Sequence, residues 1–194
     1  MKISDYIVPI FMKDELNGTG FIVGNTLITA AHVVISKENV CHFLYRGNNI
    51  SVGPDNIFLY EYPKEKCLQG LGNIYLDLAI YNLENLDSPL ELRKPQMSDP
   101  CFYQGYSDSL HIDTYTNLYL DNRDWYYPSQ EEKPISIINT YISGNGRCKK
   151  GNSGGPLFQG KHIVGMLVGN QQYQNFSMDR YIKSDYISET ISNL

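Results

Sequence analysis

Several features that define other classes of protein are missing from this chain of 194 residues. It has no apolar run of about 18 residues, and its longest runs, such as 163–168, are too short to span a bilayer. Positive charge is scarce, because 16 Lys and Arg stand against 21 Asp and Glu and form no basic stripe. Phosphate contacts supply most nucleic-acid affinity. We therefore expect no membrane contact and no nucleic-acid partner.

Two further signals are absent. The N-terminal residues lack the apolar core and small-residue cleavage site of a signal peptide. No Cys-x-x-Cys pair occurs among the cysteines, which removes the usual spacing of a zinc or redox site. The four cysteines are Cys41, Cys67, Cys101 and Cys148. We expect reduced thiols, a cytoplasmic protein and no metal or organic cofactor.

Tyrosine and glycine are plentiful, with 16 of each, and 42% hydrophobic residues suffice for a packed core. This composition favours strands and turns over helices. Short apolar runs broken by turn signals predict two barrels of about six strands each. The expected strands are Tyr6–Phe11, Gly20–Val23, Leu27–Ala31, Val40–Tyr45, Ile57–Tyr62 and Leu78–Leu83, then Cys101–Tyr106, Thr114–Leu120, Ile135–Ile142, Pro156–Phe158, Ile163–Val168 and Phe176–Ile182.

A polar stretch with three prolines, residues 86–100, indicates a linker between the halves. We expect an N-terminal barrel over residues 1–95 and a C-terminal barrel over residues 96–194. Apolar positions at helical spacing predict a short terminal helix at about 184–194. The longest candidate loop of the second half spans residues 122–134, and long loops in compact domains are often functional.

The most informative segment is Lys150–Leu157, KGNSGGPL. A serine hydroxyl is a poor nucleophile unless a base takes its proton and donors stabilise the oxyanion that forms. Glycines allow a sharp turn, so the N–H groups of Gly151 and Ser153 can point into one pocket. A glycine-rich β-turn is the structural alternative.

A base is available in His32, which follows an apolar strand and two alanines small enough to allow close approach. His42, His111 and His162 lie in polar or mixed settings and are expected to be exposed or hydrogen-bonded instead. Asp77 stands at the mouth of an apolar strand, where burial favours a partner such as a histidine N–H. Taken alone, Asp77 would be a strand-capping residue.

Together, these residues form the chain order His, Asp, Ser, which is the order of a known catalytic triad. The sequence resembles the trypsin/chymotrypsin-like serine proteases from about Ile7 to the terminal helix. The segments that carry the resemblance are Gly18–Val23, Thr29–His32, Asp77–Ile80 and Gly151–Leu157.

The resemblance implies an all-β fold of two six-stranded antiparallel barrels with the site between them and a short C-terminal helix. It implies Ser153 as nucleophile, His32 as general base and then acid, and Asp77 as the residue that orients His32. The N–H groups of Gly151 and Ser153 would form the oxyanion hole. The chemistry of the residues gives the same roles.

The chain departs from the animal digestive members of this family in three places. They carry an aspartate before the serine that pairs with a cleaved N-terminus, whereas Asn152 stands here and no Ile-Val-Gly-Gly sequence lies near the N-terminus. Val33 follows His32 where those members have a disulfide-forming cysteine. The chain is more similar to bacterial and viral members, and we expect no activation by cleavage.

Substrate preference is predicted from one position. In the family, the residue six before the nucleophile lies at the base of the pocket for the side chain before the scissile bond (P1), and here it is Arg147. An inward Arg147 would favour an acidic P1 residue. A solvent-exposed Arg147 would leave an apolar pocket for hydrophobic or small residues. Val168 and Gly169 are expected to pair with the substrate as an added strand.

These observations lead to a serine endopeptidase that acts on protein or peptide substrates through an acyl-enzyme. One alternative is a non-catalytic binding scaffold with a protease fold. Another is a protease whose oxyanion loop becomes ordered only with a regulatory partner protein.

Overall fold

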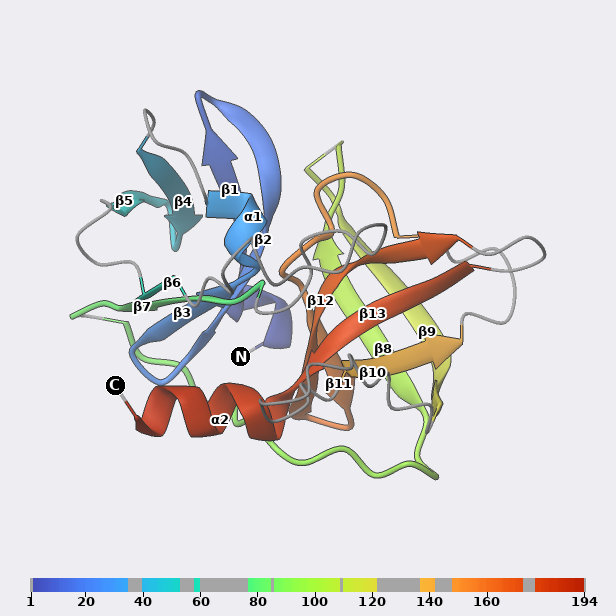
Figure 1. Ribbon diagram of the computed structural model, residues 1–194. Coiled ribbons are helices and arrows are strands. Elements are labelled where there is room, and N and C mark those ends of the chain that lie inside the picture. Colours follow the sequence, from blue (N-terminus) through green and yellow to red (C-terminus); the bar gives the residue numbers. More distant parts are fainter. Residues whose placement is uncertain are drawn as a thin grey trace, which may run out of the picture.

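The computed structural model describes residues 2–34, 40–52, 58–59, 77–84, 86–108, 110–121, 137–141, 148–172 and 177–193. Its strands form two antiparallel sheets that lie side by side (Figure 1), which confirms the expected all-β fold. The elements are η1 (Ile3–Tyr6), β1 (Ile7–Met12), β2 (Glu15–Val23), β3 (Thr26–Thr29), α1 (Ala31–Val34), β4 (Cys41–Tyr45), β5 (Asn48–Val52), β6 (Phe58–Leu59), β7 (Ala79–Asn82), β8 (Cys101–Tyr106), β9 (Ile112–Asp121), β10 (Ile137–Tyr141), β11 (Pro156–Gln159), β12 (His162–Gln172), β13 (Ser177–Lys183) and α2 (Ser184–Ser192).

The first sheet has the strand order β5-β4-β1-β2-β3-β7-β6. Among the described residues it contains seven strands where six were expected, because the edge strand β5 was not predicted. Both the β1–β2 and β4–β5 connections are two-residue turns in which both residues have positive φ: Lys13 and Asp14 at 51° and 63°, and Arg46 and Gly47 at 49° and 79°. Such turns match the right-handed twist of a hairpin, so they set the register next to each turn. A shift between Ile10 and Phe11 then changes the register of β1 against β2.

The second sheet is a closed barrel in the order β10-β13-β12-β11-β8-β9. Its longest strand is β12, which extends four residues beyond the predicted end at Val168. In the ladder with β13, Leu167 pairs with Tyr181 and Gly169 pairs with Arg180, so Val168 forms a bulge.

The segment between β7 and β8 runs along the second barrel. The Ile163 N–H donates to the Glu91 carbonyl at 2.9 Å, and the Arg93 N–H donates to the Ile163 carbonyl at 2.8 Å. The predicted boundary between residues 95 and 96 falls in this segment and stays a prediction. After β13, α2 passes beneath the first sheet (Figure 1) and ends at Ser192, close to the predicted helix end.

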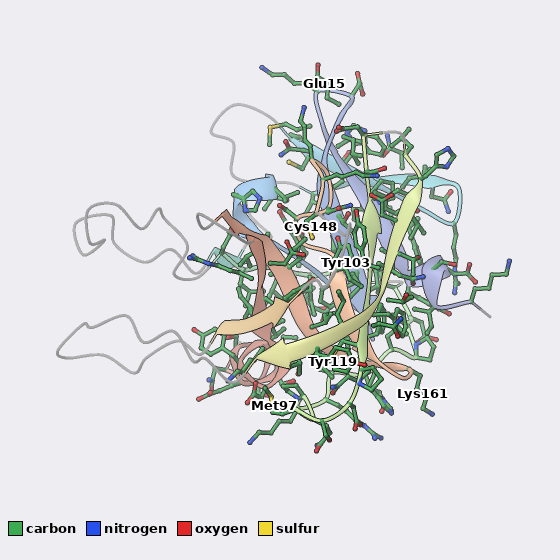
Figure 2. All side chains as sticks on the ribbon, turned by 90° about the vertical axis from the view of Figure 1, so that its right-hand side faces the viewer. Glu15, Met97, Tyr103, Tyr119, Cys148 and Lys161 are labelled. Atoms are coloured by element: carbon green, nitrogen blue, oxygen red, sulfur yellow. The ribbon has the colours of Figure 1, made fainter. Side chains whose placement is uncertain are left out.

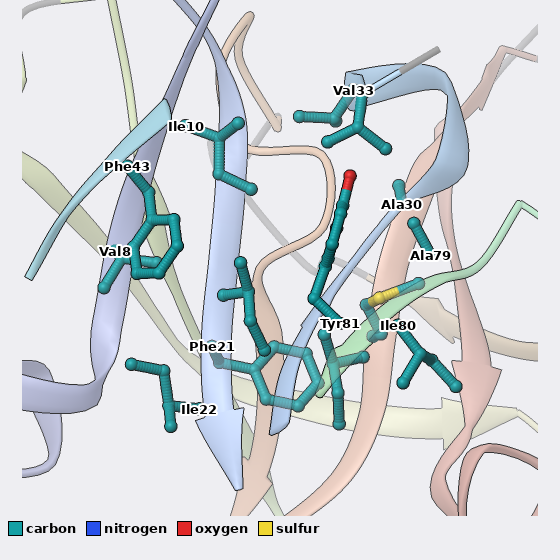
Figure 3. Packing of buried hydrophobic residues seen from close by; sticks show 14 of the residues in the cluster. Val8, Ile10, Phe21, Ile22, Ala30, Val33, Phe43, Ala79, Ile80 and Tyr81 are labelled. Carbon is teal, nitrogen blue, oxygen red and sulfur yellow. The ribbon is translucent and has the colours of Figure 1, made fainter. Parts of the chain in front are cut away.

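One hydrophobic cluster joins the two halves. It combines buried residues of the first sheet, such as Phe21 and Ile28, with Ile163 of β12 and Ile187 of α2. Figure 3 shows the part of this cluster beneath α1, where the Tyr81 oxygen points toward Val33. A second cluster around Tyr103 fills the closed barrel. The halves therefore share apolar burial, which is the main favourable contribution to folding.

Several expectations fall outside the described residues: the loop 122–134, Arg147, Cys67 and most of the strand expected at Ile57–Tyr62. The ends of the strands expected at Ile135–Ile142 and Phe176–Ile182 also lie outside them. No helix in the described part of the chain is long and apolar enough to cross a membrane.

Candidate active site

His32 lies on the short helix α1 rather than at the end of a strand. The helix follows β3 directly, and its residues Ala31, Val33 and Val34 are buried. Asn17 of β2 holds the C-terminal end of α1, because its side-chain amide donates to the Val33 carbonyl at 2.5 Å. With the apolar residues facing the core, the His32 side chain remains 48% exposed. The imidazole is thus accessible to a substrate while its backbone is fixed.

Asp77 precedes β7 and is only 8% exposed. Thr29 pairs with Ala79 in the antiparallel β3–β7 ladder, so the residues after Thr29 approach those before Ala79. The Asp77 carboxylate makes two contacts with His32. Its Oδ1 accepts the backbone N–H of His32 at 2.7 Å, and its Oδ2 contacts ring Nδ1. A carboxylate only accepts hydrogen bonds. The contact therefore favours the proton on Nδ1 and leaves Nε2 free to act as a base.

Ser153 lies in the loop between residue 148 and β11, and this loop is packed against the first sheet. The Thr19 N–H donates to the Ser153 carbonyl at 2.8 Å, and the Gly154 N–H donates to the Leu167 carbonyl of β12 at 2.7 Å. Gly154 has a φ of +86°, and a Cβ there would overlap the Thr19 carbonyl and the Thr29 hydroxyl. Glycine is thus required for both conformation and space.

Gly18 shows how close Ser153 lies to the His32 helix. A Cβ at Gly18 would overlap the Val33 side chain on one side and lie 3.0 Å from the Ser153 carbonyl on the other. The described residues include no hydrogen bond between the Ser153 hydroxyl and the His32 ring. Catalytic hydrogen bonds are often long before substrate binds. The structure therefore joins His32 with Asp77 and places the Ser153 carbonyl across Gly18 from Val33, the neighbour of His32.

Asn152 organises the turn before Ser153. It is completely buried, its Oδ1 accepts the Lys149 N–H at 2.7 Å, and its Nδ2 donates to the Tyr106 carbonyl at 2.7 Å. The backbone adds a hydrogen bond from the Asn152 N–H to the Lys149 carbonyl at 3.1 Å. Asp113 of β9 lies next to this turn, with Oδ2 at 3.4 Å from Asn152 Nδ2 and Oδ1 at 3.6 Å from Lys149 Nζ. Neutral hydrogen bonds of Asn152 therefore hold the turn, and the Asp113 carboxylate adds a contact to Asn152 and an ion pair with Lys149.

The two N–H groups predicted to form the oxyanion hole, those of Gly151 and Ser153, donate to no other group in the described part of the chain. Gly151 has a φ of +92°, a conformation that glycine adopts readily. Its carbonyl accepts the Thr19 hydroxyl at 2.7 Å, and the Thr19 oxygen accepts the Tyr106 N–H at 2.8 Å. The loop is therefore fixed while both donors remain available.

A group of hydroxyl and thiol side chains lies behind the loop. Tyr103 is completely buried and Cys148 is half-buried, and the two side chains lie close together (Figure 2). The Cys148 thiol donates to Asp179 Oδ2 at 2.9 Å. Burial raises the pKa of the Tyr103 hydroxyl, and burial together with the Asp179 carboxylate raises the pKa of the Cys148 thiol. These groups stay neutral near pH 7.

Two of the three residues predicted to bind substrate, Val168 and Gly169, lie on β12, and the third, Arg147, lies outside the described residues. Val168 is buried in the bulge, whereas Gly169 has open space where a side chain would lie. The sequence did not assign roles to Thr19, Thr29 or Tyr103, although Thr19 and Thr29 belong to the motifs quoted above. Their function depends on contacts between distant segments, which spacing does not reveal.

Comparison with known proteins identifies the family and the fold of the chain. A sequence profile of the family described as Trypsin matches residues 2–191. A search of curated proteins found no significant match.

Solved structures show the same fold. The Rv3671c protease of Mycobacterium tuberculosis in its active form has a TM-score of 0.70 and 14% identity, with 98% of this chain and 81% of that one covered. Neuropsin, a serine protease of mouse brain, has a TM-score of 0.67 and 16% identity, with 96% of this chain and 94% of that one covered. The serine protease of a human pathogenic astrovirus has a TM-score of 0.57 and 19% identity, with 92% of this chain and 89% of that one covered.

The fold is that of the trypsin-like serine proteases, which hydrolyse peptide bonds. The profile match extends over nearly the whole chain, and the chain belongs to the trypsin family.

Proposed function

We propose that the protein is a serine endopeptidase in which Ser153, His32 and Asp77 act as a catalytic triad. The observation that carries this proposal is the double contact of the Asp77 carboxylate with His32, through the backbone N–H and ring Nδ1. This contact fixes both the tautomer and the orientation of the imidazole. The position of Ser153 across Gly18 from the His32 helix supports the same assignment.

Each proton in the reaction then has a defined path. His32 Nε2 accepts the Ser153 hydroxyl proton while Oγ attacks the scissile carbonyl, and a tetrahedral oxyanion forms. The N–H groups of Gly151 and Ser153 stabilise its charge. The protonated His32 gives its proton to the leaving amine, the C–N bond breaks, and the acyl-enzyme remains. Water, deprotonated by His32, hydrolyses that ester and restores Ser153.

The ordered oxyanion loop bears on the partner-gated alternative. Asn152, Thr19 and Tyr106 hold the turn through contacts within this chain. These contacts support activity without cleavage at the N-terminus and without a regulatory partner. A cytoplasmic location and a likeness to bacterial and viral members remain parts of the proposal.

Two groups of opposite charge bear on the P1 preference. Arg147 lies outside the described residues, and an inward guanidinium there would favour glutamate or aspartate. The next residue, Cys148, donates its thiol hydrogen to the buried Asp179 carboxylate, and this negative charge would favour a basic P1 residue. We propose the acidic preference, and a peptide library varied at P1 tests it. Preferential cleavage after basic or apolar residues would contradict it.

A fluorophosphonate probe tests the reaction itself, because an activated serine displaces its fluoride whatever the substrate. We expect covalent labelling of the purified wild-type protein and none of Ser153→Ala. Equal labelling of both would show that another residue reacts, which would contradict the triad. Absence of labelling in both would favour the scaffold or partner-gated alternative, and lysate from the native host would distinguish these two.

A further inference from the structure

A tyrosine from the interior of the second barrel contacts the nucleophile loop. Tyr103 of β8 is completely buried, and its hydroxyl donates to the carbonyl of Asn152 at 2.5 Å. The same carbonyl accepts the Gly155 N–H at 3.0 Å. One donor from the barrel interior and one from the loop itself thus hold the carbonyl of the residue that precedes Ser153.

The direction of this carbonyl determines the direction of the next N–H group. A trans peptide group is planar, so its C=O and N–H point in opposite directions. The Asn152 carbonyl points toward Tyr103, and the Ser153 N–H on the same peptide must therefore point away from it. In the described part of the chain, that N–H donates to no other group. It is one of the two donors assigned to the oxyanion hole.

Two glycines make space for the Tyr103 hydroxyl. A Cβ at Gly105 or at Gly155 would overlap this hydroxyl, so both positions must lack a side chain for the oxygen to reach the loop. Neither glycine has a positive φ, which means that space rather than backbone conformation requires them.

The ring of Tyr103 is itself held in place. It stacks on Tyr115 with the centroids 5.8 Å apart and lies tilted against Tyr181 at 6.2 Å. Burial raises the pKa of the Tyr103 hydroxyl well above its ordinary value. The hydroxyl therefore remains a donor throughout the pH range in which a histidine base works.

We propose that Tyr103 is a positioning residue for the oxyanion hole: its hydroxyl orients the Asn152–Ser153 peptide so that the Ser153 N–H faces the developing oxyanion. This inference rests on the proposed function. Tyr103 does not touch the reacting atoms and acts through the peptide group alone.

Tyr103→Phe tests this inference, because it removes the oxygen and keeps the ring. Loss of a complete oxyanion donor costs about 10²–10³-fold in kcat, so a misdirected donor should cost about tenfold to hundredfold, with KM within about twofold. Affinity for a peptide aldehyde should fall by a similar factor, since its hemiacetal places an oxyanion in the same hole. Affinity of the Ser153→Ala form for an uncleaved peptide should not change with Tyr103→Phe.

Two control variants separate positioning from general effects of losing a hydroxyl. Tyr81→Phe removes a buried hydroxyl that has no hydrogen-bond partner among the described residues, and Tyr119→Phe removes one from a side chain that is 53% exposed on β9. Both should retain wild-type kcat. Replacement of Tyr103 by 4-aminophenylalanine keeps a donor at this position and should restore most of the activity.

Four outcomes would overturn the inference: kcat of Tyr103→Phe within twofold of wild type, the same loss in Tyr81→Phe, unchanged aldehyde affinity, or equal activity of the Phe and aminophenylalanine variants. Wild-type turnover is measured first with Ser153→Ala as control. An inactive wild type would contradict the proposed function, whereas an active wild type with an equally active Tyr103→Phe would contradict only the role of Tyr103.

Discussion

Replacing Asp77 by asparagine should inactivate the enzyme while leaving its fold intact. The carboxylate accepts two hydrogens from His32, whereas an amide offers one oxygen and one NH₂. If the amide oxygen keeps the backbone N–H of His32, the NH₂ faces Nδ1 and drives the ring proton to Nε2, where it blocks base catalysis. If the amide is reversed, its NH₂ faces the backbone N–H, and the unpaired donors cost about 1–3 kcal/mol.

The expected loss follows from these two arrangements. Both remove the negative charge that stabilises the imidazolium, and such a change in a triad lowers kcat by about 10⁴-fold. At about 1.36 kcal/mol for each factor of ten, this corresponds to about 5 kcal/mol of transition-state stabilisation.

Steady-state kcat and the rate of fluorophosphonate labelling measure the loss. Asp185→Asn, the same chemical change at an exposed position of α2, is the matched control and should retain full activity. Urea unfolding should show Asp77→Asn to be folded under assay conditions. A folded Asp77→Asn variant with kcat within tenfold of wild type would refute the assigned role of Asp77.

Two further predictions concern stability and thiol chemistry. Gly154→Ala places a side chain at a positive φ, which costs about 1–2 kcal/mol. The new Cβ also overlaps Thr19 and Thr29, and such overpacking costs about 1–3 kcal/mol. Urea unfolding should therefore show that the free energy of unfolding falls by about 2–5 kcal/mol. Gly160 has a φ of +58° and open space where a Cβ would lie, so Gly160→Ala should lower the free energy of unfolding only by the cost of the positive φ. An equal decrease in both variants would refute the contribution of packing at Gly154. Burial raises the pKa of Cys101 to about 12, so its thiolate fraction at pH 8 should be about a thousandfold below that of a thiol with pKa near 9. Iodoacetamide should modify Cys101 at least that much more slowly in the native than in the urea-unfolded protein, as followed by peptide mass spectrometry, and similar rates would contradict the burial.

The contact between Asp77 and His32 was predictable because both residues stand in local motifs. The sequence around Asp77 indicated an acid that would be costly to bury without a histidine partner, and the structure brings it to His32. The helix under His32 was not predicted, since the run Ala30–Val34 has as much strand character as helix character. Four residues are too few for a helical period to show.

Other parts of the architecture depend on contacts that no local pattern records. Strand β5 begins with Asn48 and Asn49, both exposed, and polar edge strands lack the apolar alternation that identifies a strand. Tyr103 reads in the sequence as an ordinary strand residue. Its contact with the loop requires glycines at positions 105 and 155, which are 50 residues apart. Only the folded barrel brings these three positions together.

The Thr19 hydroxyl has a consequence for how this enzyme loses activity. Thr19 belongs to the first sheet, yet it binds both the Gly151 carbonyl and the Tyr106 N–H of the second half. Any opening between the two halves breaks these two hydrogen bonds, and it also separates Ser153, in the second half, from His32 and Asp77, in the first. The hydrogen bonds of Asn152 to Lys149 and Tyr106 lie within the second half and would remain. The arrangement of the proposed triad is therefore lost before either sheet has to unfold.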